Sequence, residues 1–414
     1  MSVSPKVNNS NQSSFNNIYD VAIVGAGISG SVCAALLARS SFKVALIDKA
    51  RFPRSKICGE GLMPAGRRLL ETLGLTEKLQ QAGAKSFSAL RFHLPNERIL
   101  ELDFSKQNSK QLGCVLSRES LDHLLLRFAT SHKEVNFREG FKVVKSQIGS
   151  QGVELILQTR ERCERLKARV LVAADGIKSR FRSVGGIGRL SSGRRRFALR
   201  RLYDNYRNSG QTVDVYCAKG VEAYVAPLSP TQARITLLSY RNTFTLSKGV
   251  DALYEDLLEH FPAILDRLGK GSQCSAAEAT SPVSARFTRC HANRLVLVGD
   301  AAGAVDPVTG QGMTIALRDA HLAADILGRA LEKNLLTSEH LSVFTKERED
   351  YFLSSYQLGQ NLLRVLRFPW LARRVSLALT RSNQLSNKLI ALANDPRTAK
   401  QLSQIDKFRL LLGF

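Results

Sequence analysis

The stretch that most constrains the fold is GAGISG, residues 25–30, which spaces three glycines as G-x-G-x-x-G. It follows YDVAIV, residues 19–24, whose apolar and β-branched residues predict a short buried strand. The residues after the glycines predict a helix, and FKVALIDK, residues 42–49, predicts a second buried strand. That second strand ends at Asp48, eighteen positions after Gly30. This order of strand, glycines, helix, strand and acid is typical of dinucleotide-binding sites.

Each residue of this motif has its own expected task. Gly25 permits the tight turn, Gly27 lets the backbone approach a pyrophosphate, and Gly30 lets helix and strand pack closely. The N-terminus of the helix offers free N–H groups to the phosphates. Asp48 is expected to accept a hydrogen bond from a ribose hydroxyl. The alternative for the motif is a glycine-rich turn that binds nothing.

The distribution of buried strands predicts an interleaved α/β chain. Apolar runs that end in acidic turns recur at 169–174 and 294–299, where AADGIKSR carries Asp175 and VGDAAGAVDPVTGQGM carries Asp300. Segments that alternate apolar and polar residues lie between them and predict antiparallel sheet. We expect a discontinuous Rossmann-like domain, an inserted, mostly antiparallel β-sheet domain and a C-terminal helical tail. The predicted boundaries are 1–17 for a disordered tail, 18–85 with 112–188 and 277–335 for the first domain, 86–111 with 189–276 for the second, and 336–414 for the helical region.

Cysteine usage and the absence of other motifs narrow the class of protein. The seven cysteines are scattered singly, without CxxC pairs, so we expect no metal site and no disulfide framework. Such usage favours a reducing, cytoplasmic location. The sequence contains no run of about 18 apolar residues, so we expect no transmembrane helix. The G-x-S-x-G, H-E-x-x-H and P-loop patterns of hydrolases and NTPases are missing from the sequence.

Four motifs together resemble a known family. GAGISG, LSRESLD with Arg118, AADGIKSR and VGDAAGAVDPVTGQGM resemble, in this order, the motifs of FAD-dependent oxidoreductases of the para-hydroxybenzoate hydroxylase fold. The resemblance spans residues 19–330 and implies that the discontinuous domain binds FAD and the sheet domain binds substrate. It implies FAD contacts for Ser29, Gly30, Asp48, Lys49, Arg118 and Asp300. It also implies that Gly310, Gly312 and Met313 lie beside the isoalloxazine and that Asp175 belongs to a motif used for both FAD and NADPH.

The segment RFPRSKICGEGLMP, residues 51–64, has no helix or strand pattern. It starts where the Asp48 strand ends, at the carboxyl end of the sheet, where ligands bind in such folds. Its K-x-C-G-E-G core is similar to that of geranylgeranyl reductases, flavin halogenases and related monooxygenases. Lys56 is expected to meet a phosphate or the negative edge of the flavin. Cys58 either faces the flavin or is a small buried apolar residue, and both alternatives stay open.

The strand EAYVAP, residues 222–227, predicts part of a substrate pocket. Its spacing resembles the pocket-lining strand of flavin halogenases and of isoprenoid reductases. Tyr224 stands where both families have tryptophan, which counts strongly against a halogenase and moderately against a lipid reductase. Tyr224 is therefore predicted to line the pocket with an aromatic ring and a hydroxyl, the alternative being an ordinary strand tyrosine.

We expect an FAD-dependent monooxygenase that hydroxylates or epoxidises an apolar or aromatic small molecule through a flavin C4a-hydroperoxide. The first alternative is a flavin reductase of isoprenoid double bonds, and the second is a basic non-catalytic flavoprotein that docks on a membrane. The sequence has no second dinucleotide fingerprint, so NAD(P)H would bind transiently near the flavin or donate through a separate reductase. No catalytic acid or base is identified, since His93 and His291 are candidates by residue type only and are expected to be structural.

The formal net charge is +24, and basic residues gather at RRRFALRR, 194–201, and in the C-terminal tail. From residue 361 onward the tail has ten Lys or Arg and two Asp, mixed with apolar residues at helical spacing. Such a tail lies peripherally on an anionic membrane, or it packs on the FAD domain as helices with a basic outer face, which we favour. No nucleic-acid-binding motif accompanies the charge, so we expect no nucleic-acid partner. The sequence does not indicate an oligomeric state.

Overall fold

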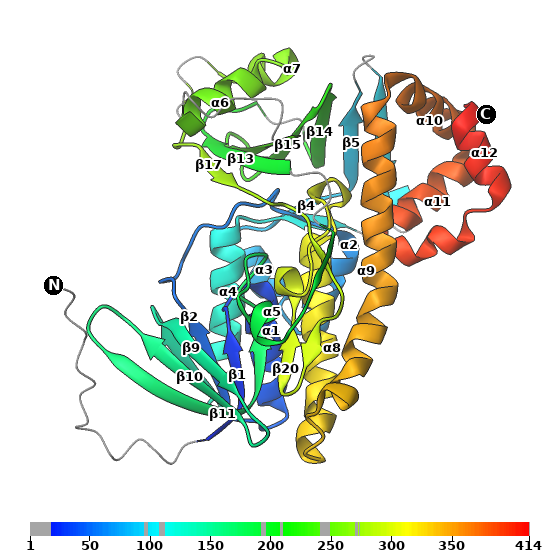
Figure 1. Cartoon of the computed structure of the whole chain (residues 1–414). Helices are drawn as coiled ribbons and strands as arrows, with labels where there is room; N and C mark the ends of the chain where they lie inside the picture. Colours follow the sequence, from blue (N-terminus) through cyan, green and yellow to red (C-terminus); the bar gives the residue numbers. More distant parts are fainter. Residues whose placement is uncertain are drawn as a thin grey trace.

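The computed structural model describes residues 18–94, 98–106, 112–191, 196–207, 210–240, 249–269, 272 and 274–413. The predicted disordered tail, 1–17, lies outside the described residues. Figure 1 shows two large β-sheets, one above the other, with the long helix α9 (Ser338–Arg367) running beside both. The other C-terminal helices lie together at the edge of the upper sheet.

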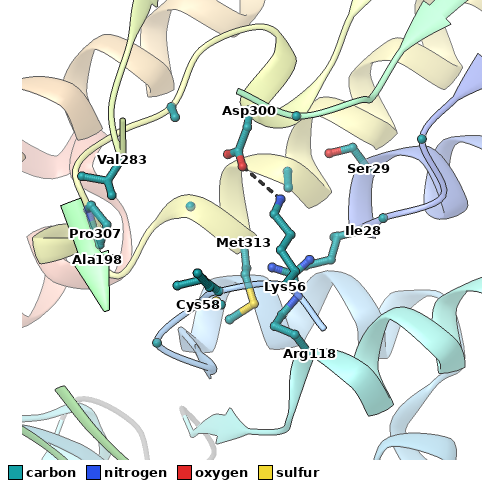
Figure 2. A pocket seen from close by; sticks show the side chains of 18 of the residues that line it. Ile28, Ser29, Lys56, Cys58, Arg118, Ala198, Val283, Asp300, Pro307 and Met313 are labelled. Atoms are coloured by element: carbon teal, nitrogen blue, oxygen red, sulfur yellow. Dashed lines mark hydrogen bonds and ion pairs between the residues drawn. The ribbon is translucent and has the colours of Figure 1, made fainter. Parts of the chain in front are cut away.

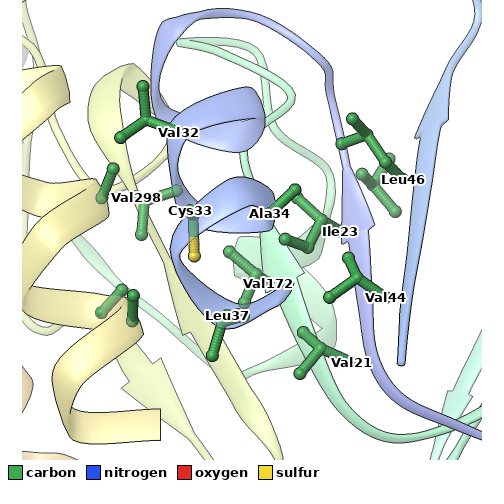
Figure 3. Packing of buried hydrophobic residues seen from close by; sticks show 14 of the residues in the cluster. Val21, Ile23, Val32, Cys33, Ala34, Leu37, Val44, Leu46, Val172 and Val298 are labelled. Atoms are coloured by element: carbon green, nitrogen blue, oxygen red, sulfur yellow. The ribbon is translucent and has the colours of Figure 1, made fainter. Parts of the chain in front are cut away.

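The first sheet has a parallel core in the order β20-β11-β1-β2-β8. Near-continuous apolar runs form these strands because helices cover the sheet, and α1 places Val32, Cys33, Ala34 and Leu37 over its strands (Figure 3). The sequence patterns do not predict β8, in which only two of five residues are apolar. The elements are β1 (Tyr19–Val24), β2 (Val44–Asp48), β8 (Val135–Glu139), β9 (Lys142–Ile148), β10 (Val153–Gln158), β11 (Cys163–Ala173), β19 (His291–Ala292), β20 (Leu295–Leu297), α1 (Ile28–Arg39), α4 (Arg118–Thr130) and α8 (Gly312–Glu332).

The turn between β1 and α1 is packed without room for a side chain. Gly25 has φ +107°, and a Cβ there would lie 2.3 Å from the carbonyl oxygen of Ala174. A Cβ on Gly30 would lie 1.8 Å from the carbonyl oxygen of Gly25. Any larger residue at either position would therefore push α1 away from the strands.

The second sheet has the order β17-β13-β16-β15-β14-β5-β6 and is antiparallel except for the parallel pair β14–β5. Helices α6 and α7 pack on it through an apolar cluster that includes Tyr254 and Leu257. The elements are β5 (Ala89–His93), β6 (Ile99–Asp103), β13 (Arg196–Tyr203), β14 (Thr212–Ala218), β15 (Val221–Pro227), β16 (Ala233–Tyr240), β17 (Glu278–Thr280), α6 (Gly249–Leu258) and α7 (Pro262–Leu265). The predicted α/β fold class, with a second, mostly antiparallel sheet and a helical tail, is confirmed.

Domain boundaries stay a prediction, although β17 continues the second sheet past the predicted limit at residue 276. Smaller elements connect the two sheets. They are β3 (Gly61–Leu62), β4 (Lys85–Phe87), β7 (Gly113–Val115), β12 (Arg189–Ser191), β18 (Arg286–Phe287), α2 (Pro64–Thr72), α3 (Thr76–Gln81) and α5 (Phe181–Val184).

The C-terminal region consists of α9 followed by α10 (Pro369–Arg381), α11 (Asn383–Asn394) and α12 (Gln404–Leu412). Its inner side is packed on the body of the molecule, where Ala372 and Ile390 share an apolar cluster with Phe92 and Leu102. Within the described ranges, no helix has both the length and the apolar character needed to cross a membrane.

A buried ion pair fastens α9 to the first sheet. The Arg348 guanidinium contacts both carboxylate oxygens of Asp319 on α8, at 2.9 and 3.0 Å, and donates to the carbonyl oxygen of Gly303. Asp319 also accepts from the backbone N–H of Gly299 at 2.7 Å. The pair therefore fixes the turn that follows β20, where Asp300 lies.

We predict that Arg348→Ala lowers the free energy of unfolding by about 3–5 kcal/mol, because it leaves the buried Asp319 carboxylate without its charged partner. Arg329→Ala is the matched control, since it removes an exposed ion pair between Arg329 and Asp325, both on α8. It should lower the free energy of unfolding by at most about 0.5 kcal/mol. Urea denaturation of the two variants measures the difference. Equal losses in both would contradict the assignment.

Candidate functional site

A cavity of about 730 Å³ lies between the two sheets. It opens at the carboxyl ends of β1, β2 and β11, marked by Val24, Asp48 and Ala174, which is where ligands bind in parallel α/β sheets. Residues of the second sheet, among them Val213 and Val215, form the opposite wall. The volume falls within the range of ligand and cofactor pockets.

The structure brings nearly all of the predicted site residues to this one cavity. Gly30 is the exception, because it lies buried beneath Gly25 and packs the turn. The FAD contacts of these residues stay predictions. Those lining the cavity are Gly25, Gly27, Ser29, Asp48, Lys49, Lys56, Cys58, Arg118, Asp175, Tyr224, Asp300, Gly310, Gly312 and Met313.

Asp48 is held firmly at the end of β2. Its carboxylate accepts from the backbone N–H of Ala26 at 2.8 Å and from that of Ala50 at 2.9 Å. The Arg54 guanidinium lies 3.9 Å from it and pairs with Asp122 at 3.2 Å. Each oxygen keeps lone pairs for further donors, so the carboxylate can still accept from the hydroxyls of a ribose.

Arg118 stands at the first turn of α4, which Ser117 caps by accepting from the N–H of Ser120. Its guanidinium pairs with Asp122 at 2.9 Å. Burial would lower the pKa of Arg118, but the Asp122 carboxylate outweighs it and raises that pKa. The side chain therefore presents a permanent cation to the cavity.

Lys56 and Asp300 form an ion pair in the cavity lining, with 3.0 Å between Nζ and Oδ2 (Figure 2). It joins the segment after β2 to the turn after β20, 244 residues apart in sequence. Burial would raise the pKa of Asp300, but the Lys56 ammonium outweighs it and lowers that pKa. Asp300 therefore stays ionised at neutral pH and can accept from a hydroxyl-rich chain. The structure pairs Lys56 with this carboxylate, and its predicted contact with phosphate or flavin stays a prediction.

A buried arginine supports the segment that carries Lys56 and Cys58. Arg200 on β13, only 1% exposed, donates to the carbonyl oxygen of Lys56 at 2.9 Å and pairs with Glu60 at 3.2 Å and Glu278 at 2.6 Å. Burial raises the pKa of Glu60, although Arg234 and Arg200 oppose the shift. The network fixes an otherwise irregular loop on the cavity wall.

This network is not evident from the sequence, in which RRRFALRR has the composition of an exposed basic cluster. In the described part of that run, residues 196–201, the arginines are buried and paired with carboxylates. Arg196 pairs with Asp306 and Glu222, and Arg201 pairs with Asp251 and Glu255. The sequence signal for this burial is the period-2 alternation of β13, which puts Arg196 and Arg200 on one face of the strand.

The wall contributed by the second sheet is apolar. Tyr224 and Thr236 are its polar exceptions, and the buried hydroxyl of Tyr224 has no hydrogen-bond partner among the described residues. Burial raises the pKa of Tyr224 well above its usual value, so the hydroxyl stays protonated. Tyr224 lines the cavity, but its hydroxyl oxygen is buried in the wall. Thr236 also lines this wall, but its hydroxyl contacts the carbonyl oxygen of Cys58. The apolar residues of the second sheet at the cavity are Leu90, Phe92, Ala198, Val213, Val215 and Leu238.

The two histidines considered from the sequence lie away from the cavity lining. His93 Nε2 lies 3.0 Å from the Asp214 carboxylate, and its ring stacks on Tyr216. His291 Nδ1 lies 2.6 Å from the Thr345 hydroxyl, and burial together with Arg289 lowers the pKa of His291. Cys58 is half-buried and lines the cavity, while Met313 lies on the same lining (Figure 2).

The residues present fit an FAD molecule. Helices α1 and α8 both begin at the cavity, and neither N-terminus has a side-chain cap, so backbone N–H groups remain for anionic ligand atoms. A Cβ on Gly312 would meet nothing within 4 Å, which shows open space at the start of α8. Asp48 and Asp300 supply acceptors for the ribose and ribityl hydroxyls, and the apolar wall suits a ring system.

Comparison with protein families gives one match. A sequence profile described as "FAD binding domain" matches residues 18–351, which covers both large sheets and the start of α9.

Curated relatives are distant and differ in name. "Conditioned medium factor receptor 1" of Dictyostelium discoideum is 27% identical over 82% of this chain and 68% of that protein. "Digeranylgeranylglycerophospholipid reductase" of Methanocella arvoryzae is 26% identical over 80% of this chain and 82% of that protein. "Squalene monooxygenase" of Rattus norvegicus is 25% identical over 74% of this chain and 54% of that protein.

Among solved structures, a flavoprotein/dehydrogenase from Cytophaga hutchinsonii superposes with a TM-score of 0.84. The match covers 96% of this chain and 99% of the other at 17% identity, so it shows a shared fold.

We predict that Asp300→Ala weakens FAD binding about 10- to 100-fold, because a charge-assisted hydrogen bond is lost and Lys56 is left unpaired. The flavin-to-protein absorbance ratio after gel filtration and titration of the apoprotein with FAD measure the effect. Asp325→Ala, an exposed change on α8, is the control and should keep full occupancy. Full occupancy in Asp300→Ala as well would remove Asp300 from the binding site.

Proposed function

The chain belongs to the FAD-binding-domain family, and on this premise we propose that it is an FAD-dependent monooxygenase of an apolar or aromatic small molecule. Family membership confirms the predictions of an FAD cofactor and of an oxidoreductase enzyme. The reaction, its substrate class and the contributing residues are the parts proposed here.

The observation that carries the proposal is the chemistry of the second-sheet wall. Among the residues that the structure describes, those of this wall that line the cavity include no charged side chain, and the hydroxyl groups belong to Tyr224 and Thr236. Such a wall binds an apolar molecule and excludes water from the reacting centre. Reduction of a carbon–carbon double bond needs a proton donor beside the substrate, and Tyr224 is a poor one because burial raises its pKa. Oxygen insertion into an apolar substrate needs no proton donor on this wall.

The roles of the chain's own residues follow from their positions. The turn of Gly25 and Gly27, with the α1 N-terminus, would hold the pyrophosphate, and Asp48 and Asp300 would accept from ribose and ribityl hydroxyls. Arg200, through the Lys56 carbonyl oxygen, would hold the loop against the cofactor. Bound FAD supplies the redox chemistry, with NAD(P)H as the proposed electron donor.

A reductase of isoprenoid double bonds is the second candidate. The similarity to a digeranylgeranylglycerophospholipid reductase favours it, and an apolar wall would suit an isoprenoid as well. Burial raises the pKa of two cavity-lining carboxyls, Glu60 and Asp175. Asp175 belongs to the proposed cofactor motif, so Glu60 is the candidate proton donor for this alternative. The two candidates differ in their use of O₂, because the monooxygenase consumes O₂ and the reductase does not.

We predict that turnover consumes NAD(P)H and O₂ together and that the product carries ¹⁸O when ¹⁸O₂ is supplied. A panel of terpenes, sterol precursors, quinols and phenols, followed by mass spectrometry, makes the measurement. The anaerobic arm uses dithionite-reduced enzyme with the same panel. A hydrogenated product formed without O₂ would establish the reductase and overturn the monooxygenase.

We predict that Tyr224→Phe changes KM and kcat less than about twofold, because the hydroxyl is buried in the wall and the rest of the side chain, which lines the cavity, is kept. Folding stability without substrate should be unchanged or higher, since the deleted hydroxyl is buried without a partner. Steady-state kinetics and thermal melting measure the two effects. A rise in KM of threefold or more would contradict this prediction and show that the hydroxyl reaches the substrate.

A further inference from the structure

The outward side of α10 and α12 is apolar and exposed. Trp370 is 56% exposed, Phe408 62% and Ile405 66%, values that a packed helix does not show. On α12 the exposed residues follow helical spacing, so they form one stripe rather than scattered contacts. The apolar face, as we call it, consists of Phe368, Trp370, Ile405, Phe408, Leu411 and Leu412.

The two halves of this apolar face adjoin. The Arg374 guanidinium lies 5.5 Å from the centroid of the Trp370 ring and donates to the carbonyl oxygen of Leu411. Gly413, which ends α12, packs against the backbone of Arg374. The aromatic start of α10 and the end of the α12 stripe therefore lie on neighbouring surface.

Basic residues far outnumber acidic ones around the apolar face in the described part of the tail. In the described residues from 361 onward the two acids are both paired, Asp395 with Arg318 and Arg397, and Asp406 with Lys388. Exposed basic side chains flank the face on α10, on α12 and at the end of α9, so any occupant meets cations at its rim. They are Arg364, Arg367, Arg373, Arg374, Lys407 and Arg409.

We propose that the apolar face docks on an anionic lipid bilayer, with α10 and α12 lying in its surface. Apolar and aromatic side chains within a basic rim match the acyl boundary and the anionic headgroups. A tryptophan at the start of α10 suits the interface, where an apolar ring with a polar N–H is stable. A second copy of the chain fits less well, because a symmetric dimer would bring two positive rims together.

Packed side chains and a hydrogen bond connect the tail that carries the apolar face to the cavity lining. Ala372 and Ile390, on the inner side of the tail, share one apolar cluster with the cavity-lining Met63 and Phe92. The side chain of Gln311, at the start of α8, also contacts the carbonyl oxygen of Ala393. Docking would hold the apolar wall of the cavity near the bilayer. The docking proposal uses residues outside the cavity lining and stands apart from the proposed reaction.

The test uses the full-length flavoprotein and vesicles of phosphatidylcholine with or without phosphatidylserine. Sedimentation should show binding to the anionic vesicles that weakens as salt is added. Trp370 is the only tryptophan of the chain, so its emission reports on this face directly. We expect a blue shift and protection from acrylamide when anionic vesicles are added.

Two pairs of substitutions separate the apolar and electrostatic parts. Phe408→Ser with Leu411→Ser, and Arg373→Glu with Lys407→Glu, should each weaken vesicle binding about tenfold or more. Matched controls are Leu190→Ser, an apolar residue of similar exposure, and Lys145→Glu with Arg160→Glu. The β9–β11 strands, near which both basic control positions lie, are on the opposite side of the molecule from the tail (Figure 1). These controls should bind as the unaltered chain does.

Three outcomes would overturn the proposal. They are no binding of the unaltered chain to anionic vesicles, equal losses in test and control variants, and a dimer that dissociates when Phe408 and Leu411 are replaced. FAD content and far-UV circular dichroism check that each variant is folded. Should a variant not fold, the Trp370 emission of the unaltered chain still decides. Enzyme activity on a soluble substrate is read separately, so a failed reaction proposal and a failed docking proposal are distinguishable.

Discussion

The contact between the β1–α1 turn and Ala174 is the constraint on which the site depends. With no side chain at Gly25 or Gly30, α1 begins directly over the junction of β1 and β11. That closeness puts the N–H of Ala26 within reach of Asp48, and it brings Asp175 to the edge of the same cavity. A wider turn would separate the helix N-terminus from both acids.

Much of this arrangement could be predicted from the sequence, because its signals are local. Apolar runs marked the parallel strands, and glycine and aspartate positions marked the turns that line the cavity. The rest depends on partners remote in sequence. Lys56 pairs with Asp300, 244 residues later, and Arg200 pairs with Glu60, so composition alone made a basic cluster out of a buried network. Strand β8 was missed because its few apolar residues carry no clear period.

The C-terminal helices have an inner and an outer side, which correspond to the two alternatives that the sequence leaves open. Their inner side packs on the second sheet and the cavity wall, as expected for helices that complete a core. Their outer side is more than a basic surface, because aromatic and aliphatic residues stand exposed among the cations. One helix pair can therefore serve packing and docking, since the two uses fall on different faces.

The order of strands in the first sheet has a consequence for biosynthesis. β20 joins the sheet beside β11, and the cavity lining runs from Val24 to Ala316. During synthesis the first strands leave the ribosome long before β20 and the start of α8. The cavity lining is therefore incomplete until these two segments have emerged. With FAD in this cavity, as proposed, its insertion would come late in the synthesis of the chain. A chain released early would keep the glycine motif and still lack the part of the cavity that β20 and α8 supply.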